Sequence, residues 1–281
     1  MRFVILVASF FVTLTSSQAQ RPAFEVASLK PSAVVGPINT TPGRFIAVGQ
    51  SLKALIGFAY RKRAYQIFGG PEWMSADRWE IQAKVPEGVV VSQPSTMEEL
   101  EKSLTTPDAI ALMLQSLLQD RFQLKIHHET RELPIYVLAV APGSPKIIFS
   151  EDQTPLVFGG GGTPLERLPN GMPVLTRGSF SIRSRTDRRI MEGKAIPMSR
   201  IVNLLVNELG RPVVDKTNLK GLYDVRLEWA PENLRADPEN GAPVAPMLTT
   251  ALQEQLGLKL DSTKGPVEVI VVDGAQKPAE N

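Results

Sequence analysis

LLQDRFQLKI, at residues 117–126, returns little changed as ALQEQLGLKL at residues 251–260. In each copy, apolar residues at helical spacing give way to alternating apolar and polar residues, which predicts a helix that runs into a strand. The residues that recur unchanged at the same spacing are Leu118, Gln119, Leu124 and Lys125, which return as Leu252, Gln253, Leu258 and Lys259. The repeat predicts a helix–strand unit that occurs twice in the chain.

The same order of elements surrounds both copies: helix, short strand, alternating strand, loop, helix and two further strands. In the first half these patterns cover residues 51–60, 65–70, 78–85, a helix from 106, and strands at 123–131 and 133–140. In the second half they cover residues 197–210, 212–215, 222–229, 248–257, 258–260 and 267–273. A tight turn is expected between the last two strands of the first half, and a hairpin around Lys264-Gly265-Pro266 in the second. This shared order predicts internal duplication.

The helices and strands each have one apolar face. In the strand at 78–85, Trp79 and Ile81 point one way while Glu80 and Gln82 point the other, which is typical of a strand buried on one side. The helix that runs into the first repeat copy is expected to begin with Thr106 as N-cap and Pro107 as its first residue.

The predicted fold class is α+β: two tandem related modules, each with two amphipathic helices packed on a small mixed or antiparallel sheet. The first module is assigned to residues 20–149 and the second to residues 176–281. Residues 150–175 separate them and contain four consecutive glycines and several prolines, a composition that predicts a linker or surface loop.

The first residues have the pattern of a secretory signal. Arg2 precedes an apolar stretch that is too short to span a bilayer, and Ser17-Gln18-Ala19 provides small residues at a cleavage site. Residues 1–19 are therefore expected to be a signal peptide, with an uncleaved anchor as the alternative. The expected destination is the periplasm or the extracellular space, with no membrane segment after cleavage. The chain has no cysteine, so neither disulfides nor thiolate chemistry is available.

The composition gives no reason to expect a nucleic-acid partner. The chain of 281 residues carries 31 basic and 29 acidic side chains, a formal charge of +2, and 43% hydrophobic residues. Nucleic-acid binding normally requires a pronounced basic surface. The one basic run, Arg183, Arg185, Arg188 and Arg189, is expected to be a solvated strand edge, with an anion or lipid-headgroup contact as the alternative.

The sequence predicts no catalytic centre, no metal site and no cofactor. His127 and His128 are the only histidines, and adjacent strand residues point to opposite faces, which favours structural roles over a shared metal. Catalysis or metal binding by His127 with Glu129 is the alternative. A pair of carboxylates would also suffice for hydrolysis; the candidates near strand ends are Asp77, Glu80, Asp215 and Asp224.

Trp73 is the one candidate binding residue. It follows Gly69-Gly70-Pro71 in a predicted turn, where an aromatic side chain can be exposed to a partner or a sugar. The alternative is simple packing at the edge of the core.

Several stretches, distributed over nearly the whole chain after residue 20, together resemble a family of uncharacterised soil-associated secreted proteins, a domain of unknown function. They are FEVASLKPS, GGPEWMSADRWEIQAK, LLQDRFQLKIHHETRELPIYVLAV, GRPVVDKTNLKGLYDVRLEW and ALQEQLGLKLDSTKGPVEVIVVDGAQKPAEN. The resemblance implies no activity or catalytic residue. In that family the domain also occurs behind sensor-type membrane metallopeptidases, but the HExxH motif of those enzymes is absent here. The element order also resembles, less closely, the short N-terminal modules of secretins and TonB-dependent receptors, which bind other proteins.

The leading functional hypothesis is an exported, non-enzymatic module that binds an envelope protein or peptide through an open sheet edge or an uncovered sheet face. One alternative is an envelope hydrolase that uses carboxylates. The other is an extracytoplasmic sensor whose small-molecule or glycan ligand lies between the two modules, near Trp73 and residues 150–175.

Overall fold

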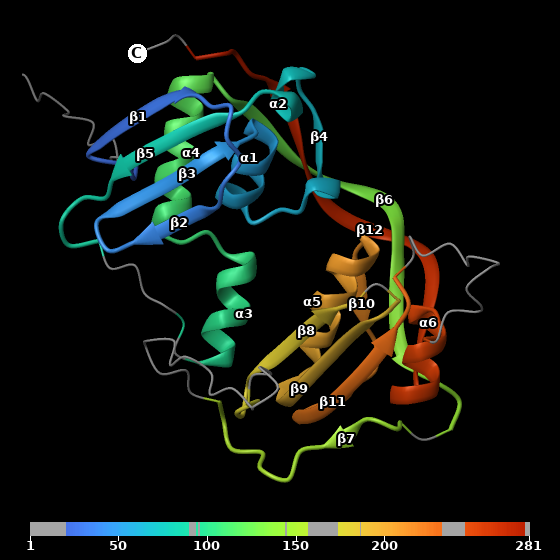
Figure 1. Cartoon of the computed structure of the whole chain (residues 1–281). Helices are drawn as coiled ribbons and strands as arrows, with labels where there is room; N and C mark the ends of the chain where they lie inside the picture. The colour runs from blue at the N-terminus through green and yellow to red at the C-terminus, as the bar shows by residue number, and fades with distance from the viewer. Residues whose placement is uncertain are drawn as a thin grey trace, which may run out of the picture.

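The computed structural model describes residues 21–89, 94, 96–143, 145–156, 174–185, 187–231 and 245–278. The predicted signal peptide therefore lies outside the described residues, as does most of the predicted linker. Within the described ranges, no helix has the length and apolar character needed to cross a membrane. The α+β class is confirmed, because helices pack against three small four-stranded sheets (Figure 1).

The first lobe is an antiparallel sheet with helices on one face. Its strand order is β1-β5-β3-β2, and the strands are β1 (Val26–Pro31), β2 (Ile38–Thr41), β3 (Arg44–Gln50) and β5 (Trp79–Lys84). The helices are α1 (Leu52–Tyr60) and α4 (Ala109–Phe122), with the short α2 (Trp73–Ala76) at one end. The alternation predicted for residues 78–85 is confirmed, because Trp79, Ile81 and Ala83 are all buried in the core of this lobe.

The second lobe contains another antiparallel sheet, in the order β7-β11-β9-β8. Its strands are β7 (Ile148–Phe149), β8 (Phe180–Ser184), β9 (Arg189–Pro197) and β11 (Leu222–Trp229). Helix α5 (Met198–Leu209) and helix α6 (Leu248–Ala251) pack on one face; α6 continues as a π-helical turn, Leu252–Leu256. A separate core, which includes Trp229, Ile201 and Leu252, fills the space between sheet and helices.

A third sheet joins the lobes. Its order is β10-β6-β12-β4, with β4 (Ile67–Gly69), β6 (Lys125–Val140), β10 (Val213–Asp215) and β12 (Leu258–Gly274). The two long strands, β6 and β12, pair antiparallel from Leu258–Val140 to Gly274–Lys125 and run from one lobe into the other (Figure 1). The short strand β10 pairs in parallel with β6 at one end of this ribbon, and the short strand β4 pairs in parallel with β12 at the other end.

These continuous strands correct two predictions. The turn expected between 131 and 133 and the hairpin expected at Lys264-Gly265-Pro266 are both wrong, because β6 and β12 pass straight through those positions. Pro134 lies opposite Lys264, and Pro266 lies opposite Glu132. Among the described residues each strand has one neighbour there, because β10 pairs with β6 at 136–138 and β4 pairs with β12 at 270–272. The proline nitrogen, which carries no hydrogen, can therefore face the side without a paired strand.

The helix starts follow from side-chain capping. Ser51 caps α1 as an acceptor from the backbone N–H of Ala54 (3.2 Å). The N-cap of α4 is Asp108, whose carboxylate accepts from the backbone N–H of Ala111 (2.8 Å), so the prediction of Thr106 is wrong. Thr106 instead caps the end of α3 (Met97–Thr105), a helix between the two lobes (Figure 1). An ionised acceptor makes a stronger cap than a hydroxyl, which favours the later start.

Candidate functional site

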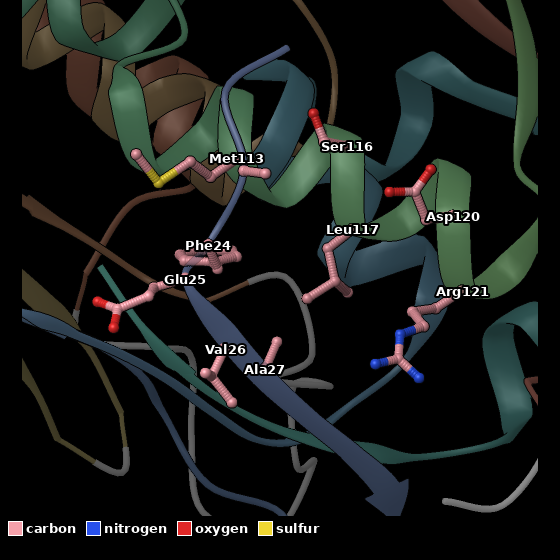
Figure 2. A pocket seen from close by; sticks show the side chains of 10 residues that line it. Phe24, Glu25, Val26, Ala27, Met113, Ser116, Leu117, Asp120 and Arg121 are labelled. Atoms are coloured by element: carbon pink, nitrogen blue, oxygen red, sulfur yellow. The ribbon is translucent and has the colours of Figure 1, made fainter. Parts of the chain in front are cut away.

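A groove runs along the outer edge of the first lobe, between the N-terminal residues of β1 and helix α4 (Figure 2). Its volume is about 300 Å³. Residues 23–27 form one side, and a stripe of α4 forms the other. The residues of this stripe are three or four positions apart, so their side chains form a row on one face of α4. They are Met113, Ser116, Leu117, Asp120 and Arg121.

Strand β1 has an open edge beside this groove. In the described part of the chain it pairs with β5 alone, from Val26–Lys84 to Pro31–Trp79. Ser32 donates its backbone N–H to the carbonyl of Arg78 (2.9 Å), and antiparallel pairing alternates, so the even-numbered residues of β1 face β5. The N–H and C=O groups of Ala27 and Leu29 therefore face the open side, where Pro31 is also tolerated because its position needs no donor.

The groove has an apolar floor and a charged rim. Phe24 and Ala27 are half-buried against the first core, and Met113 and Leu117 are buried beneath them. Glu25 lies at the rim and pairs with Lys84 (2.9 Å). Asp120 and Arg121 lie at the other end of the helical stripe, as Figure 2 shows. The arrangement can hold an extended segment whose side chains alternate between the groove and solvent.

A comparison with protein-family models assigns the chain to a family. The model described as "Protein of unknown function (DUF3738)" matches residues 53–275. The chain belongs to this family. The matched residues include the α4 side of the groove, whereas β1 precedes them. Neither the curated proteins nor the solved structures contain a match to the chain.

In this DUF3738 protein, Trp73 packs against the first core. Its ring stacks on that of Phe122, with 6.3 Å between ring centroids, and Lys277 lies over it at 5.8 Å. The side chain is half-buried at the start of α2, and it does not line the groove between β1 and α4. No contact described here gives Trp73 a role beyond packing, and its role in binding stays a prediction.

The two histidines each contact a different carboxylate across the β6–β12 ribbon. The Nδ1 of His127 lies 2.9 Å from Asp273, and the Nδ1 of His128 lies 3.1 Å from Glu268. The hydrogen bond to Asp273 raises the pKa of His127 above its ordinary value. Glu129 is farther from His127, at 3.8 Å. Among the described residues, no group of three potential His, Cys, Asp or Glu ligands is placed to hold a metal ion.

The four candidate carboxylates lie on separate elements, and each has its own partner. Asp77 pairs with Lys277 (2.7 Å), and Glu80 accepts from Gln82 (2.7 Å). Asp215 accepts from the backbone N–H of Thr217, and Asp224 from that of Ala195, both at 2.8 Å. In the regions described, these contacts are with lysine, amide or backbone groups, so the structure does not bring two of the four together.

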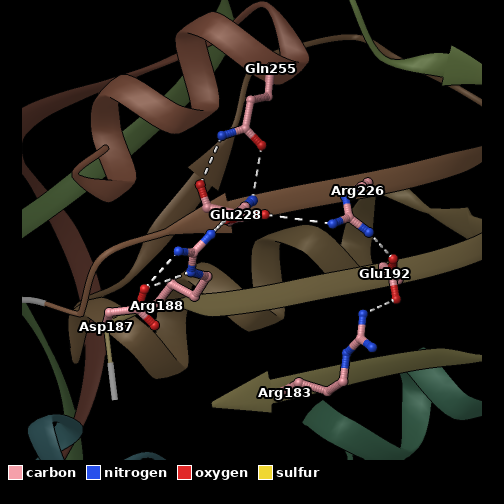
Figure 3. Close-up of polar contacts among 7 residues, drawn as sticks. All are labelled: Arg183, Asp187, Arg188, Glu192, Arg226, Glu228 and Gln255. Carbon is pink, nitrogen blue, oxygen red and sulfur yellow. Dashed lines mark hydrogen bonds and ion pairs between the residues drawn. The ribbon is translucent and has the colours of Figure 1, made fainter. Parts of the chain in front are cut away.

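The arginine run belongs to a ladder of ion pairs on the second lobe (Figure 3). Glu192 on β9 bonds both Arg183 on β8 and Arg226 on β11. Arg188 bonds Glu228 (2.5 Å) and Asp187 (2.7 Å). The ladder is fixed to the π-helical turn by Gln255, whose amide exchanges two hydrogen bonds, of 2.8 and 2.9 Å, with the Glu228 backbone.

These contacts neutralise most of the basic run within the lobe. Arg189 also has a carboxylate partner, Glu208. The structure therefore supports a structural role for the run at the exposed face of the second sheet. Arg183, Arg188 and Arg189 each have a carboxylate partner. They therefore do not form the unneutralised cluster that binding of an anion or a lipid headgroup would need.

Proposed function

We propose that this protein is an exported, non-enzymatic module that binds an extended peptide segment by adding it as a strand to the open edge of β1. The observation that carries the proposal is the coincidence of that edge with the groove along α4. An edge alone is a common feature of sheets, whereas an edge with an adjoining groove provides both main-chain and side-chain recognition.

The two walls of the groove have separate roles in this proposal. The outward backbone groups of Ala27 and Leu29 supply the hydrogen bonds for an added strand, which are independent of peptide sequence. Alternate side chains of the peptide then face Met113 and Leu117 on α4, which favours apolar residues at those positions. Glu25 at one end and Arg121 at the other add charge selectivity at the rim.

A hydrolase is the less supported alternative. A hydrolase would need a cleft in which two or three catalytic groups converge. Each of the four candidate carboxylates instead contacts a different partner. The signal-like pattern of residues 1–19 supports export. An envelope protein or an unfolded segment of one is therefore the proposed source of the peptide. The resemblance to the domain behind sensor-type membrane peptidases fits the same location.

We also propose that the two lobes descend from one duplicated unit. The strand order β1-β5-β3-β2 has its counterpart in β7-β11-β9-β8, and each third strand leads directly into a helix, α1 or α5. In the joining sheet, β10 lies beside β6 as β4 lies beside β12. The repeated sequence at 117–126 and 251–260 marks corresponding positions, at the entry to β6 and β12.

The proposed function is tested with a peptide-display selection against the full mature chain, followed by affinity measurements with the selected peptides. Ala27→Pro removes one outward-facing N–H without removing a bond to β5, so it is expected to weaken binding at least about tenfold. On binding, the amide hydrogens of Ala27 and Leu29 are expected to exchange more slowly with solvent.

The matched control is Thr40→Pro on β2, the opposite edge of the same sheet. Val48 donates to the carbonyl of Pro37 (3.2 Å), so by the same alternation the N–H of Thr40 faces outward. This variant should bind selected peptides normally. The proposal is refuted if Ala27→Pro and Thr40→Pro bind equally well, or if no peptide is enriched against the wild-type chain.

A further inference from the structure

A second and larger hollow, of about 580 Å³, lies between the two lobes. The first lobe contributes the segment after α1, residues 61–66, and α3 contributes its last turn, residues 103–105. The second lobe contributes α5 and the start of β10. Because three separate parts of the fold line this interlobe cleft, a ligand there contacts both lobes at once.

The described lining of the cleft carries positive charge and no carboxylate. Its charged residues are Arg61, Lys62 and Arg63. Two of them are neutralised from outside the lining: Arg61 pairs with Asp108 (2.9 Å), and Lys62 pairs with Glu268 (3.0 Å). Arg63 instead donates to the neutral amide oxygen of Asn207 on α5 (2.5 Å). Its positive charge thus has no carboxylate partner among the described contacts.

The guanidinium of Arg63 retains capacity for an anion. One Nη1 donor is used by Asn207, whereas an arginine side chain has five N–H donors in a planar fork that matches a carboxylate. Tyr65 lines the same cleft. Burial raises the pKa of its phenol, so the hydroxyl is protonated at neutral pH.

The rest of the lining combines polar side chains with an apolar pair of walls. Leu104 of α3 has 45% of its surface exposed, although it is a large aliphatic residue. On the opposite side, Val202 and Val206 lie one turn apart on α5, and Val213 begins the edge strand β10. An aliphatic body placed among these side chains removes apolar surface from water on both sides.

We propose that the interlobe cleft binds a small amphiphilic organic anion, with its acidic group at Arg63 and its apolar body between Leu104 and the valines of α5. The site is separate from the peptide groove, because the two share no lining residue. It also differs from the ligand site predicted near Trp73, because Trp73 is not among the described lining residues of this cleft.

The proposal is tested by isothermal titration calorimetry of the full mature chain with octanoate, octanol and octylammonium, which share one apolar body. Octanoate is expected to bind saturably with a Kd on the order of 1 mM or tighter. Octanol and octylammonium are expected to bind at least about tenfold more weakly, because only the carboxylate is complementary to Arg63. Inorganic phosphate tests whether charge without an apolar body is sufficient; much weaker binding than octanoate is expected.

Two variants separate the charge from the apolar wall. Arg63→Gln is expected to weaken octanoate binding about tenfold, while Arg63→Lys retains part of the affinity. Val206→Trp fills the cleft and is expected to abolish binding with the charge intact. The controls are Arg44→Gln, on β3 of the first lobe, and Val35→Trp at a valine that is 72% exposed. Absence of saturable octanoate binding, or equal binding by Arg63→Gln and wild type, overturns the proposal.

Discussion

Replacing Asp108 with alanine removes two interactions of one carboxylate. The side chain caps α4 by accepting from the N–H of Ala111 (2.8 Å), and it also pairs with Arg61 (2.9 Å). Loss of an N-cap costs about 1 kcal/mol. The ion pair adds roughly 0.5 kcal/mol, because the side chain of Asp108 is 50% exposed while that of Arg61 is 16% exposed. We expect Asp108→Ala to lower the free energy of unfolding by about 1.5 kcal/mol in total.

Urea denaturation of three variants separates these contributions. Asp108→Asn keeps a good capping side chain but loses the charge, so it should lose only the ion-pair contribution of roughly 0.5 kcal/mol. Thr106→Ala is the matched control, because Thr106 ends α3 and does not cap α4. It should remain within about 0.5 kcal/mol of wild type. If Thr106→Ala proves more destabilising than Asp108→Ala, the reasoning about where α4 begins is wrong.

Three further outcomes follow from the core and the charged surfaces. Phe122→Ala should lower the free energy of unfolding by about 3–5 kcal/mol and shift tryptophan fluorescence, because Phe122 is fully buried against Trp73 and Trp79; a loss below about 1 kcal/mol would contradict this packing. His127 should titrate above its usual pKa of 6.5 by NMR, and Asp273→Asn should return it toward that value. The stability that protonated His127 contributes is complete below its unfolded-state pKa and disappears as pH rises through the raised folded-state pKa. If His127 titrates in Asp273→Asn as it does in the wild type, the contact with Asp273 is excluded. Glu192→Gln, which breaks two partly exposed ion pairs, should cost about 1 kcal/mol in dilute buffer and less in about 1 M salt, as measured by urea denaturation; an effect independent of salt would argue against an electrostatic origin.

Local periodicity was sufficient to predict the amphipathic elements. Helices α1 and α5 and strands β5 and β11 lie at or within one residue of the predicted ranges, since each has a face that must be buried. The errors came where a neighbour determines the conformation. Pro134 and Pro266 are typical of turns, but each lies in a strand whose pairing partner is more than a hundred residues away. Such pairing has no local signal.

The two candidate sites depend on contacts of the same kind. The position of FEVASLK, residues 24–30, at a sheet edge depends on β5, and its groove depends on α4. Arg63 and Val206 lie far apart in sequence and share the interlobe cleft only because the lobes face each other. For Trp73 the sequence left two environments open, and the stacking on Phe122 is determined by the packed core.

The long ribbon also governs when this protein can finish folding. Ile270 and Val272, near the end of β12, belong to the core of the first lobe, while Leu258, at its beginning, belongs to the core of the second. Neither core is complete until the last strand has been synthesised and has closed a loop back to β6, a step with a large entropic cost. If the chain crosses a membrane in an extended form, both cores can be completed only after residues 258–274 have crossed.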